Sequence, residues 1–225
     1  MAVQSKGAQE LMPVQLHAVK PAALAVTIFT VPVQLNKVAL QSLLPTLSRF
    51  DLESYSPTSE GGALLANQSL QKNLTVSPTS RQVVLPVSTW RQALDEAMQM
   101  LEATASSLPV PLYVAGRVVF TSHVPVSGDS AAAHLRKVFP APSFSELGPA
   151  VTGIGVKVFL NGPLGHLVVE PLLADPTMLF IQMVQQTPQQ ASQLTNFRAF
   201  FEAEASYYEQ NVQRFLHTFF EEGRQ

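Results

Sequence analysis

The residues best suited to recognising a ligand are two cations that stand in otherwise apolar, strand-like stretches. Arg117 lies within residues 112–121, and Lys157 lies within residues 151–160. Side chains alternate between the two faces of a strand, so neighbouring strands here would gather charged and aromatic side chains on one face. Guanidinium and ammonium groups bind anions. We therefore predict a face that could hold a small anionic ligand, with five candidate residues: Arg117, Lys157, His166, Glu170 and Tyr113.

The same composition is also compatible with a face that is covered by protein. A half-apolar, half-charged face suits contact with a partner or with a helix, with the charged groups reaching to its rim. A concave pocket around Arg117, Lys157 and His166 would favour the ligand. A flat or covered face would favour protein contact, and the sequence leaves both interpretations open.

No stretch has the spacing of a catalytic or nucleotide-binding motif. The G-x-S-x-G turn of serine hydrolases is absent, and Gly153–Gly155 lacks the third glycine of a dinucleotide-binding loop. The chain has no cysteine, and its five histidines are dispersed. The nearest approach to a metal-ligand set is His123, Asp129 and His134. We predict no metal and no cofactor, and the sequence favours a protein that is not an enzyme.

The stretch Thr187–Gly223 predicts one long C-terminal helix. Thr187 is a typical N-cap, Pro188 is tolerated at the first helical position, and Gly223 can end the helix in a left-handed conformation. Apolar residues recur at steps of three and four, which places them on one face. This stripe consists of Leu194, Phe197, Phe201, Ala205, Tyr208, Val212, Phe215 and Phe219.

A second apolar set on this helix lies off the main stripe. Its members are Phe200, Tyr207, Leu216 and Phe220. Contiguous exposed aromatic patches usually mark interfaces, and aromatic anchors carry much of the binding energy there. We predict that these residues mediate self-association, as a two-fold dimer. The alternative is a central helix that is buried on several sides within one chain.

The first half of the chain alternates strands and helices. A strand is predicted at 24–31, a helix from Asn36 that Pro45 should kink or split, and two or three strands near 52–56, 63–68 and 74–87. Ser88 is predicted to cap a second helix, in which Trp90 forms a buried anchor, and the strand at 112–121 follows. This order matches the ferredoxin-like βαββαβ plan, an antiparallel sheet with helices on one face.

The second half repeats a similar order. A short helix after Asp129 precedes strands near 151–160, 166–172 and 178–185, and the long helix closes the chain. We predict an α+β fold with two ferredoxin-like halves: a flexible lead-in at 1–20, a first half at 21–122 and a second half at 123–225. The sequence does not decide whether the two halves share one sheet.

Composition favours a binding protein. The 225 residues are 46% hydrophobic and only 13% charged, so much of the surface should be hidden in a core or an oligomer. The net charge is −2 and the cations are scattered, which argues against nucleic-acid binding. No stretch predicts a signal peptide or a membrane span, so we expect a cytoplasmic, bacterial protein. The favoured function is a non-catalytic interaction or scaffold protein that self-associates or binds a protein partner. The alternative is a sensor or enzyme that binds an anionic ligand.

Overall fold

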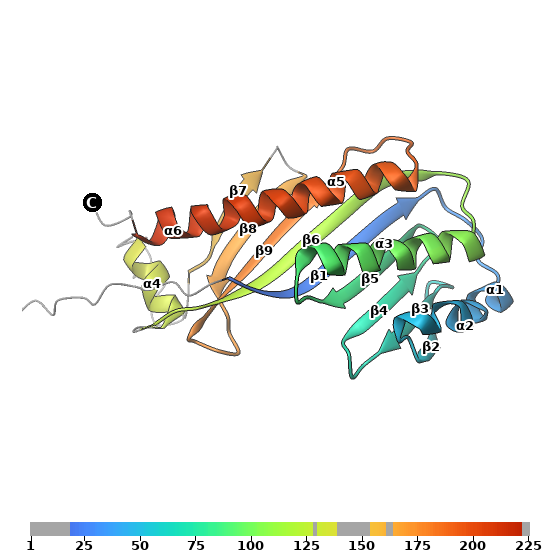
Figure 1. Ribbon diagram of the computed structural model, residues 1–225, viewed down its shortest axis with the longest axis horizontal. Helices are drawn as coiled ribbons and strands as arrows, with labels where there is room; N and C mark the ends of the chain where they lie inside the picture. The colour runs from blue at the N-terminus through green and yellow to red at the C-terminus, as the bar shows by residue number, and fades with distance from the viewer. Residues whose placement is uncertain (1–18, 128–129, 139–153, 161–163, 222–225) are drawn as a thin grey trace, which may run out of the picture.

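The computed structural model describes residues 19–127, 130–138, 154–160 and 164–221. They form an α+β fold around a nine-stranded antiparallel sheet with the order β2-β3-β4-β5-β1-β6-β9-β8-β7 (Figure 1). The predicted fold class, with its antiparallel sheet and C-terminal helix, is confirmed at this level. The strands are β1 (Lys20–Thr30), β2 (Ser54–Pro57), β3 (Ala63–Asn67), β4 (Lys72–Val76), β5 (Ser80–Pro86), β6 (Tyr113–Pro125), β7 (Val156–Leu160), β8 (Gly165–Pro171) and β9 (Met178–Gln186).

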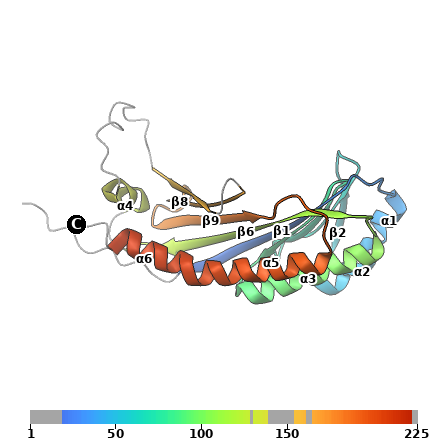
Figure 2. The ribbon, with the colours of Figure 1, turned by 90° about the horizontal axis from the view of Figure 1, so that it is seen from above.

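The long helices lie on one face of this sheet. Figure 2 shows α3 and the C-terminal helix side by side along that face. We call it the helical face, and we call the opposite one the open face, because no described helix runs along it. The helices are α1 (Lys37–Gln41), α2 (Leu43–Leu47), α3 (Trp90–Ser107), α4 (Ala131–Val138), α5 (Leu194–Tyr207), a π-helical turn (Tyr208–Val212) and α6 (Gln213–Glu221).

Both halves of the chain contribute to the sheet, and they meet where β6 pairs with β9. Val119 stands opposite Val184 at this junction. The predicted boundary between residues 122 and 123 falls inside β6, so no break in the chain separates the halves there. Two ferredoxin-like halves are not confirmed. Four strands, β2 to β5, lie between α2 and α3, where the βαββαβ plan has two.

Local hydrogen bonds explain why the apolar run at 74–87 becomes two strands. The Ser77 hydroxyl oxygen accepts bonds from the backbone N–H groups of Thr79 (3.2 Å) and Ser80 (3.0 Å). Serine favours turns because its side chain can replace a backbone partner in this way. The chain therefore reverses between β4 and β5, and the two strands pair as a hairpin.

Capping and proline positions set the ends of the first helices. The Asn36 side chain accepts a 2.8 Å bond from the Val38 N–H and caps α1, as its residue type predicts. The predicted split is confirmed, because α1 ends at Gln41 and α2, which contains Pro45, begins at Leu43. The second predicted cap is shifted by one residue. Thr89, and not Ser88, accepts the bond from Gln92 and begins α3.

The C-terminal helix begins seven residues later than its predicted cap. The Thr187 hydroxyl accepts a 3.0 Å bond from the Gly116 N–H, and the Thr187 N–H donates to the Gly116 carbonyl at 2.9 Å. The chain then continues along β6, where Gln190 N–H donates to the Val114 carbonyl at 2.8 Å. These tertiary bonds take the groups that a helix start would have used, so α5 begins at Leu194. The predicted end at Gly223 lies outside the described residues.

A π-helical turn changes which residues of this helix are buried. The π turn holds more residues than an α turn because its hydrogen bonds span five positions. Beyond the turn, the inward position moves from Phe215 to Leu216, which is 2% exposed, while Phe215 is only partly buried. The buried positions are Phe197, Phe201, Ala205, Tyr208, Val212 and Leu216.

The centre of the helical face is an aromatic cluster of Trp90, Phe120 and Tyr208. Each pair of ring centroids is 5.2 Å apart. Trp90 is 4% exposed, which confirms its predicted role as a buried anchor. The Tyr208 hydroxyl is 2.8 Å from the Ser122 hydroxyl, which is its buried hydrogen-bond partner. Burial raises the pKa of Tyr208 to about 12. This cluster fixes β6 and the C-terminal helix against α3.

Candidate binding surface on the open sheet face

Strand alternation divides the central strand β6 between the two faces. Val118, Phe120 and Ser122 are fully buried on the helical face. Arg117 and Thr121 alternate with them, so they project from the open face. The open face therefore carries the side chains of β6 that do not pack against the helices.

The register of the sheet places the predicted cations at one end of the open face. Phe159 of β7 stands opposite His166 of β8, which stands opposite Val184 of β9. Lys157 lies one row away, opposite Val168. Arg117 of β6 lies opposite Gln186 of β9. The strands β7 and β8 are therefore neighbours, whereas β9 lies between β8 and β6 and separates His166 from Arg117.

Three groups on this face act on one another electrostatically. The pKa of His166 lies below its usual value, first because the ring is partly desolvated and then because Lys157 and Arg117 disfavour a further positive charge. The lowered pKa favours the uncharged form of the imidazole. We call Arg117, Lys157 and His166 the cationic cluster.

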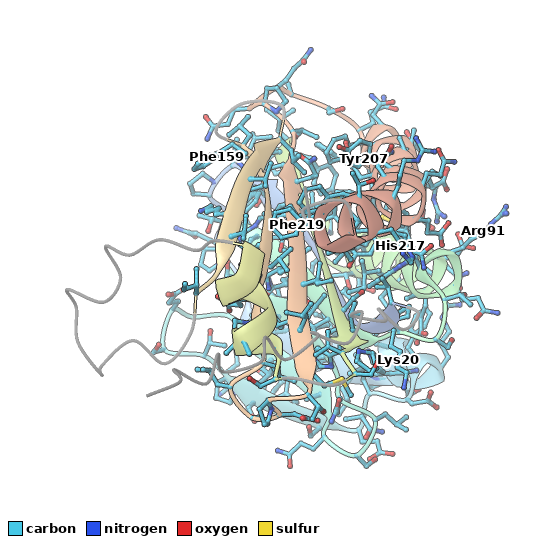
Figure 3. All side chains as sticks on the ribbon, turned by 90° about the vertical axis from the view of Figure 1, so that its left-hand side faces the viewer. Lys20, Arg91, Phe159, Tyr207, His217 and Phe219 are labelled. Carbon is cyan, nitrogen blue, oxygen red and sulfur yellow. The ribbon has the colours of Figure 1, made fainter. Side chains whose placement is uncertain are left out.

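The two charged members of the cationic cluster meet no acidic partner among the residues that the structure describes. Within the described part of the chain, neither Arg117 nor Lys157 forms an ion pair. The Lys157 ammonium lies 5.2 Å from the centroid of the Phe159 ring, which can hold it by a cation–π contact. Phe159 is 66% exposed, and Figure 3 shows it on the side of the sheet away from Tyr207 and the C-terminal helix. Glu170 is exposed on the same face, opposite Phe180.

Tyr113 does not belong to this surface, although strand alternation predicts that it should. The pairing of β1 with β6 shifts between Phe29 and Thr30, so that Thr30 stands opposite Tyr113. A bulge of this kind reverses the alternation. Tyr113 lines a cavity of about 10 Å³ on the helical side, with Arg81 and Leu194 among its neighbours.

Arg81 is a buried cation that the sequence analysis did not single out. Its guanidinium donates to the backbone carbonyls of Ser77 and Ser80, and one of its nitrogens has no hydrogen-bond partner. Burial lowers the pKa of Arg81, and the nearby Tyr113 opposes that change. Strand alternation could have indicated that Arg81 is buried, because Arg81 shares its strand face with the buried Val83 and Leu85.

The predicted interface on the C-terminal helix is largely occupied within the chain. Leu216 is buried in the core, and Phe200 is partly buried and packs against Phe201 with ring centroids 5.5 Å apart. Tyr207 remains 39% exposed. The side chain of Phe220 lies outside the described residues. The π-helical turn accounts for the burial of Leu216, which follows it, whereas Phe200 precedes the turn and is partly covered by its packing in the core.

The helical face carries a groove between α3 and α5 that is lined by charged side chains of both signs. Its volume is about 380 Å³, and its lining includes Arg91, Asp95, Glu202 and Glu209. Asp95 and Glu202 both contact Arg198, at 3.1 Å and 3.9 Å. Arg198 therefore neutralises part of the acidic charge at this groove.

Only part of the candidate metal-ligand set lies within the described residues. Among these, no group of three or more histidine, aspartate or glutamate side chains is arranged to hold a metal ion. Asp129 and the side chain of His134 lie outside the described residues. No helix in the described part of the chain has both the length and the apolar character that a membrane crossing requires.

Comparisons with known proteins give no family. The sequence matches no protein-family model and no curated protein. Among solved structures, the chain is similar to TBP from Methanococcus jannaschii with a TM-score of 0.36 and 10% identity, over 87% of this chain and 98% of that one. At this TM-score no property of that protein is transferred to this chain.

Proposed function

We propose that this chain is a non-catalytic binding protein whose open face holds an acidic, partly apolar segment of another protein. The observation that carries the proposal is the cationic cluster. Arg117 and Lys157 have no acidic partner among the described residues, and Lys157 stands beside Phe159 and opposite Val168. A partner with carboxylates and apolar side chains would complement both properties.

The exposed aromatic ring strengthens this interpretation. Phe159 is 66% exposed on an edge strand of the sheet, whereas the aromatic residues of the central cluster are buried. Aromatic side chains at the centre of an interface provide much of its binding energy, and charges around them select the partner. The C-terminal helix exposes less apolar surface to a partner, because Leu216 is buried and Phe200 is partly buried within the chain. Self-association through that helix stays a prediction.

Two further classes of function fit this surface less well. Binding along a phosphate backbone requires many cations, whereas the described open face mixes few cations with apolar and amide side chains. Catalysis would need a nucleophile with a base in reach, or another positioned acid–base pair. The cationic cluster supplies neither, because its one titrating group near neutral pH is a histidine flanked by cations.

A defined peptide probe tests the proposal. A labelled peptide of alternating glutamate and leucine should bind, and its affinity should fall as salt is raised because the contact is electrostatic. The double substitution Arg117→Gln, Lys157→Gln should weaken binding about tenfold or more. Arg91→Gln, on the helical face, is the matched control and should leave binding unchanged. Absence of binding, or equal binding by a lysine–leucine peptide, would refute the proposal.

The titration of His166 gives an independent readout by NMR. Because Lys157 and Arg117 help to lower the pKa of His166, replacing either by glutamine should raise it. A bound carboxylate should raise it as well, because it favours the imidazolium form. No change on adding the peptide, while the variants do shift the pKa, would show that the probe binds elsewhere.

The second candidate function is binding of a small anion at the same cluster. Lys157 and Arg117 both lie near enough to His166 to lower its pKa, which favours this candidate because an anion bound at His166 would lie close to positive charge. Inorganic phosphate is the probe. If phosphate raises the pKa of His166 at low millimolar concentration and the peptide does not, the small-ligand function replaces the protein-binding one.

A further inference from the structure

The two edges of the sheet differ in how well they are protected against pairing with another strand. An edge strand presents a row of backbone groups that can pair with a second chain. The edge strand β2 has four residues and ends in Pro57, which cannot donate a hydrogen bond. The opposite edge strand, β7, has five residues without proline or glycine, and its described pairing is with β8.

The sequence of β7 is suited to pairing with itself. Val156, Val158 and Leu160 face the helical side and are only partly buried there. Lys157 and Phe159 alternate with them and are exposed on the open face. Another strand beside β7 would cover the apolar side chains of Val156, Val158 and Leu160. It would also extend the open face, which carries Lys157 and Phe159.

One antiparallel register satisfies both faces of a β7–β7 pair. Centred on Val158, it pairs all five residues and places Lys157 opposite Phe159 of the second copy. This contact repeats between chains the cation–π contact that Lys157 makes within its own chain at 5.2 Å. A register centred on Lys157 would oppose two like charges, and one centred on Phe159 would lose pairs. A shift by one residue would place apolar side chains on the charged face.

We propose that two copies of this chain pair through β7, in the antiparallel register centred on Val158, to form one continuous sheet. The occupant of the edge is a second copy because the residue pattern of β7 complements itself. The pair would bring two cationic clusters onto one extended open face, so that one acidic partner could contact both. Five residues form a small contact compared with a standard interface of roughly 1,200–2,000 Å². We therefore expect reversible association that is populated at high protein concentration.

Engineered cysteines test the register directly, because the chain has no native cysteine. Val158→Cys places the same residue opposite itself and should form an intermolecular disulfide on mild oxidation. Val156→Cys stands opposite Leu160 and should cross-link much more slowly. Equal cross-linking by the two variants, or none by Val158→Cys at high protein concentration, would overturn the proposal.

Charge exchange tests the same contact without cross-linking, by sedimentation over a wide concentration range. Phe159→Lys should weaken association about tenfold or more, because it opposes Lys157 with a second lysine. Adding Lys157→Glu to that variant should restore association, because opposite charges then face each other. Leu173→Lys is the control, since Leu173 is 93% exposed outside the strands, and it should have no effect. A wild type that stays monomeric, or a dimer unaffected by Phe159→Lys, would refute β7 pairing.

The pairing and the binding of an acidic segment can fail separately. Arg117→Gln should weaken binding of the acidic peptide, but it should leave β7 association intact because Arg117 lies on β6. Loss of association in this variant would contradict the proposed contact.

Discussion

The two faces of one sheet use the same residue types in opposite ways. On the helical face, Arg198 contacts Asp95 at 3.1 Å and Glu102 at 3.0 Å, and Lys72 contacts Glu96 at 2.7 Å. On the open face, Arg117 and Lys157 have no such partner among the described residues. Charges that are paired contribute to holding the layers together, whereas unpaired charges remain available to another molecule.

The aromatic residues follow the same division. Trp90, Phe120 and Tyr208 pack against one another within the helical face, and each is nearly or fully buried. Phe159 on the open face is 66% exposed. Since adjacent residues of a strand alternate between these faces, neighbouring positions should differ sharply in what they contribute. One face should determine stability, and the other should determine binding.

The largest expected contrast is between Trp90 and Phe159. Trp90→Ala should lower the free energy of unfolding by about 3–5 kcal/mol, because it leaves a cavity in the aromatic cluster. Phe159→Ala should change it by less than about 0.5 kcal/mol, because the ring is mostly exposed. Urea unfolding of both variants measures the difference. Equal losses would show that the open face is covered in the folded chain.

A smaller contrast lies between two adjacent tyrosines. Tyr208→Phe should cost about 1 kcal/mol, because it removes the 2.8 Å bond to the buried Ser122 hydroxyl. Tyr207→Phe is the matched control and should cost less than about 0.5 kcal/mol, since Tyr207 is 39% exposed. Thermal unfolding of the two variants measures both losses of stability. A larger loss for Tyr207→Phe than for Tyr208→Phe would contradict a stabilising hydrogen bond between Tyr208 and Ser122.

Alkaline pH tests the same residue. The pKa of Tyr208 is raised to about 12 in the folded chain, above an unfolded value of about 10. The unfolded state therefore loses this proton first, and the stability that the neutral hydroxyl contributes is complete below pH of about 10 and is lost as the pH rises toward about 12. The Tyr208→Phe variant should lack this part of the alkaline loss. An identical pH profile in both proteins would contradict the assignment.

The smallest expected effects compare two arginines. Arg198→Gln should lower the free energy of unfolding by less than about 1 kcal/mol, because its carboxylate partners are partly exposed, and the loss should shrink in high salt. Arg117→Gln should change stability by less than about 0.5 kcal/mol, since Arg117 is exposed and forms no ion pair among the described residues. Denaturation at low and at high salt measures both. A clear loss of stability for Arg117→Gln would reveal an intramolecular partner.

Local patterns predicted the elements and most of the candidate surface. Alternation within single strands placed Arg117, Lys157, His166 and Glu170 on one face of the sheet, and the register of the paired strands agrees with that placement. The same rule misplaced Tyr113, because a shift in pairing with β1 reverses the alternation at that end of β6. The start of the C-terminal helix was misplaced for a related reason, since Thr187 bonds to Gly116 rather than to its own helix. Each error occurs where a long-range hydrogen bond competes with a local signal.

The sequence by itself determined which residues are apolar, where they recur at helical or strand spacing, and therefore the α+β class with its long final helix. It also determined that Trp90 would be buried, because the only tryptophan begins a regular amphipathic helix. Only the tertiary structure decided that both halves share one sheet and that the π-helical turn draws Leu216 inward. It also decided that Arg198 and Lys72 meet carboxylates on the helical face, whereas Arg117 and Lys157 meet none among the described residues. These properties depend on which distant residues become neighbours. Strand pairing and helix docking determine which distant residues become neighbours, and local sequence patterns carry no information about those contacts.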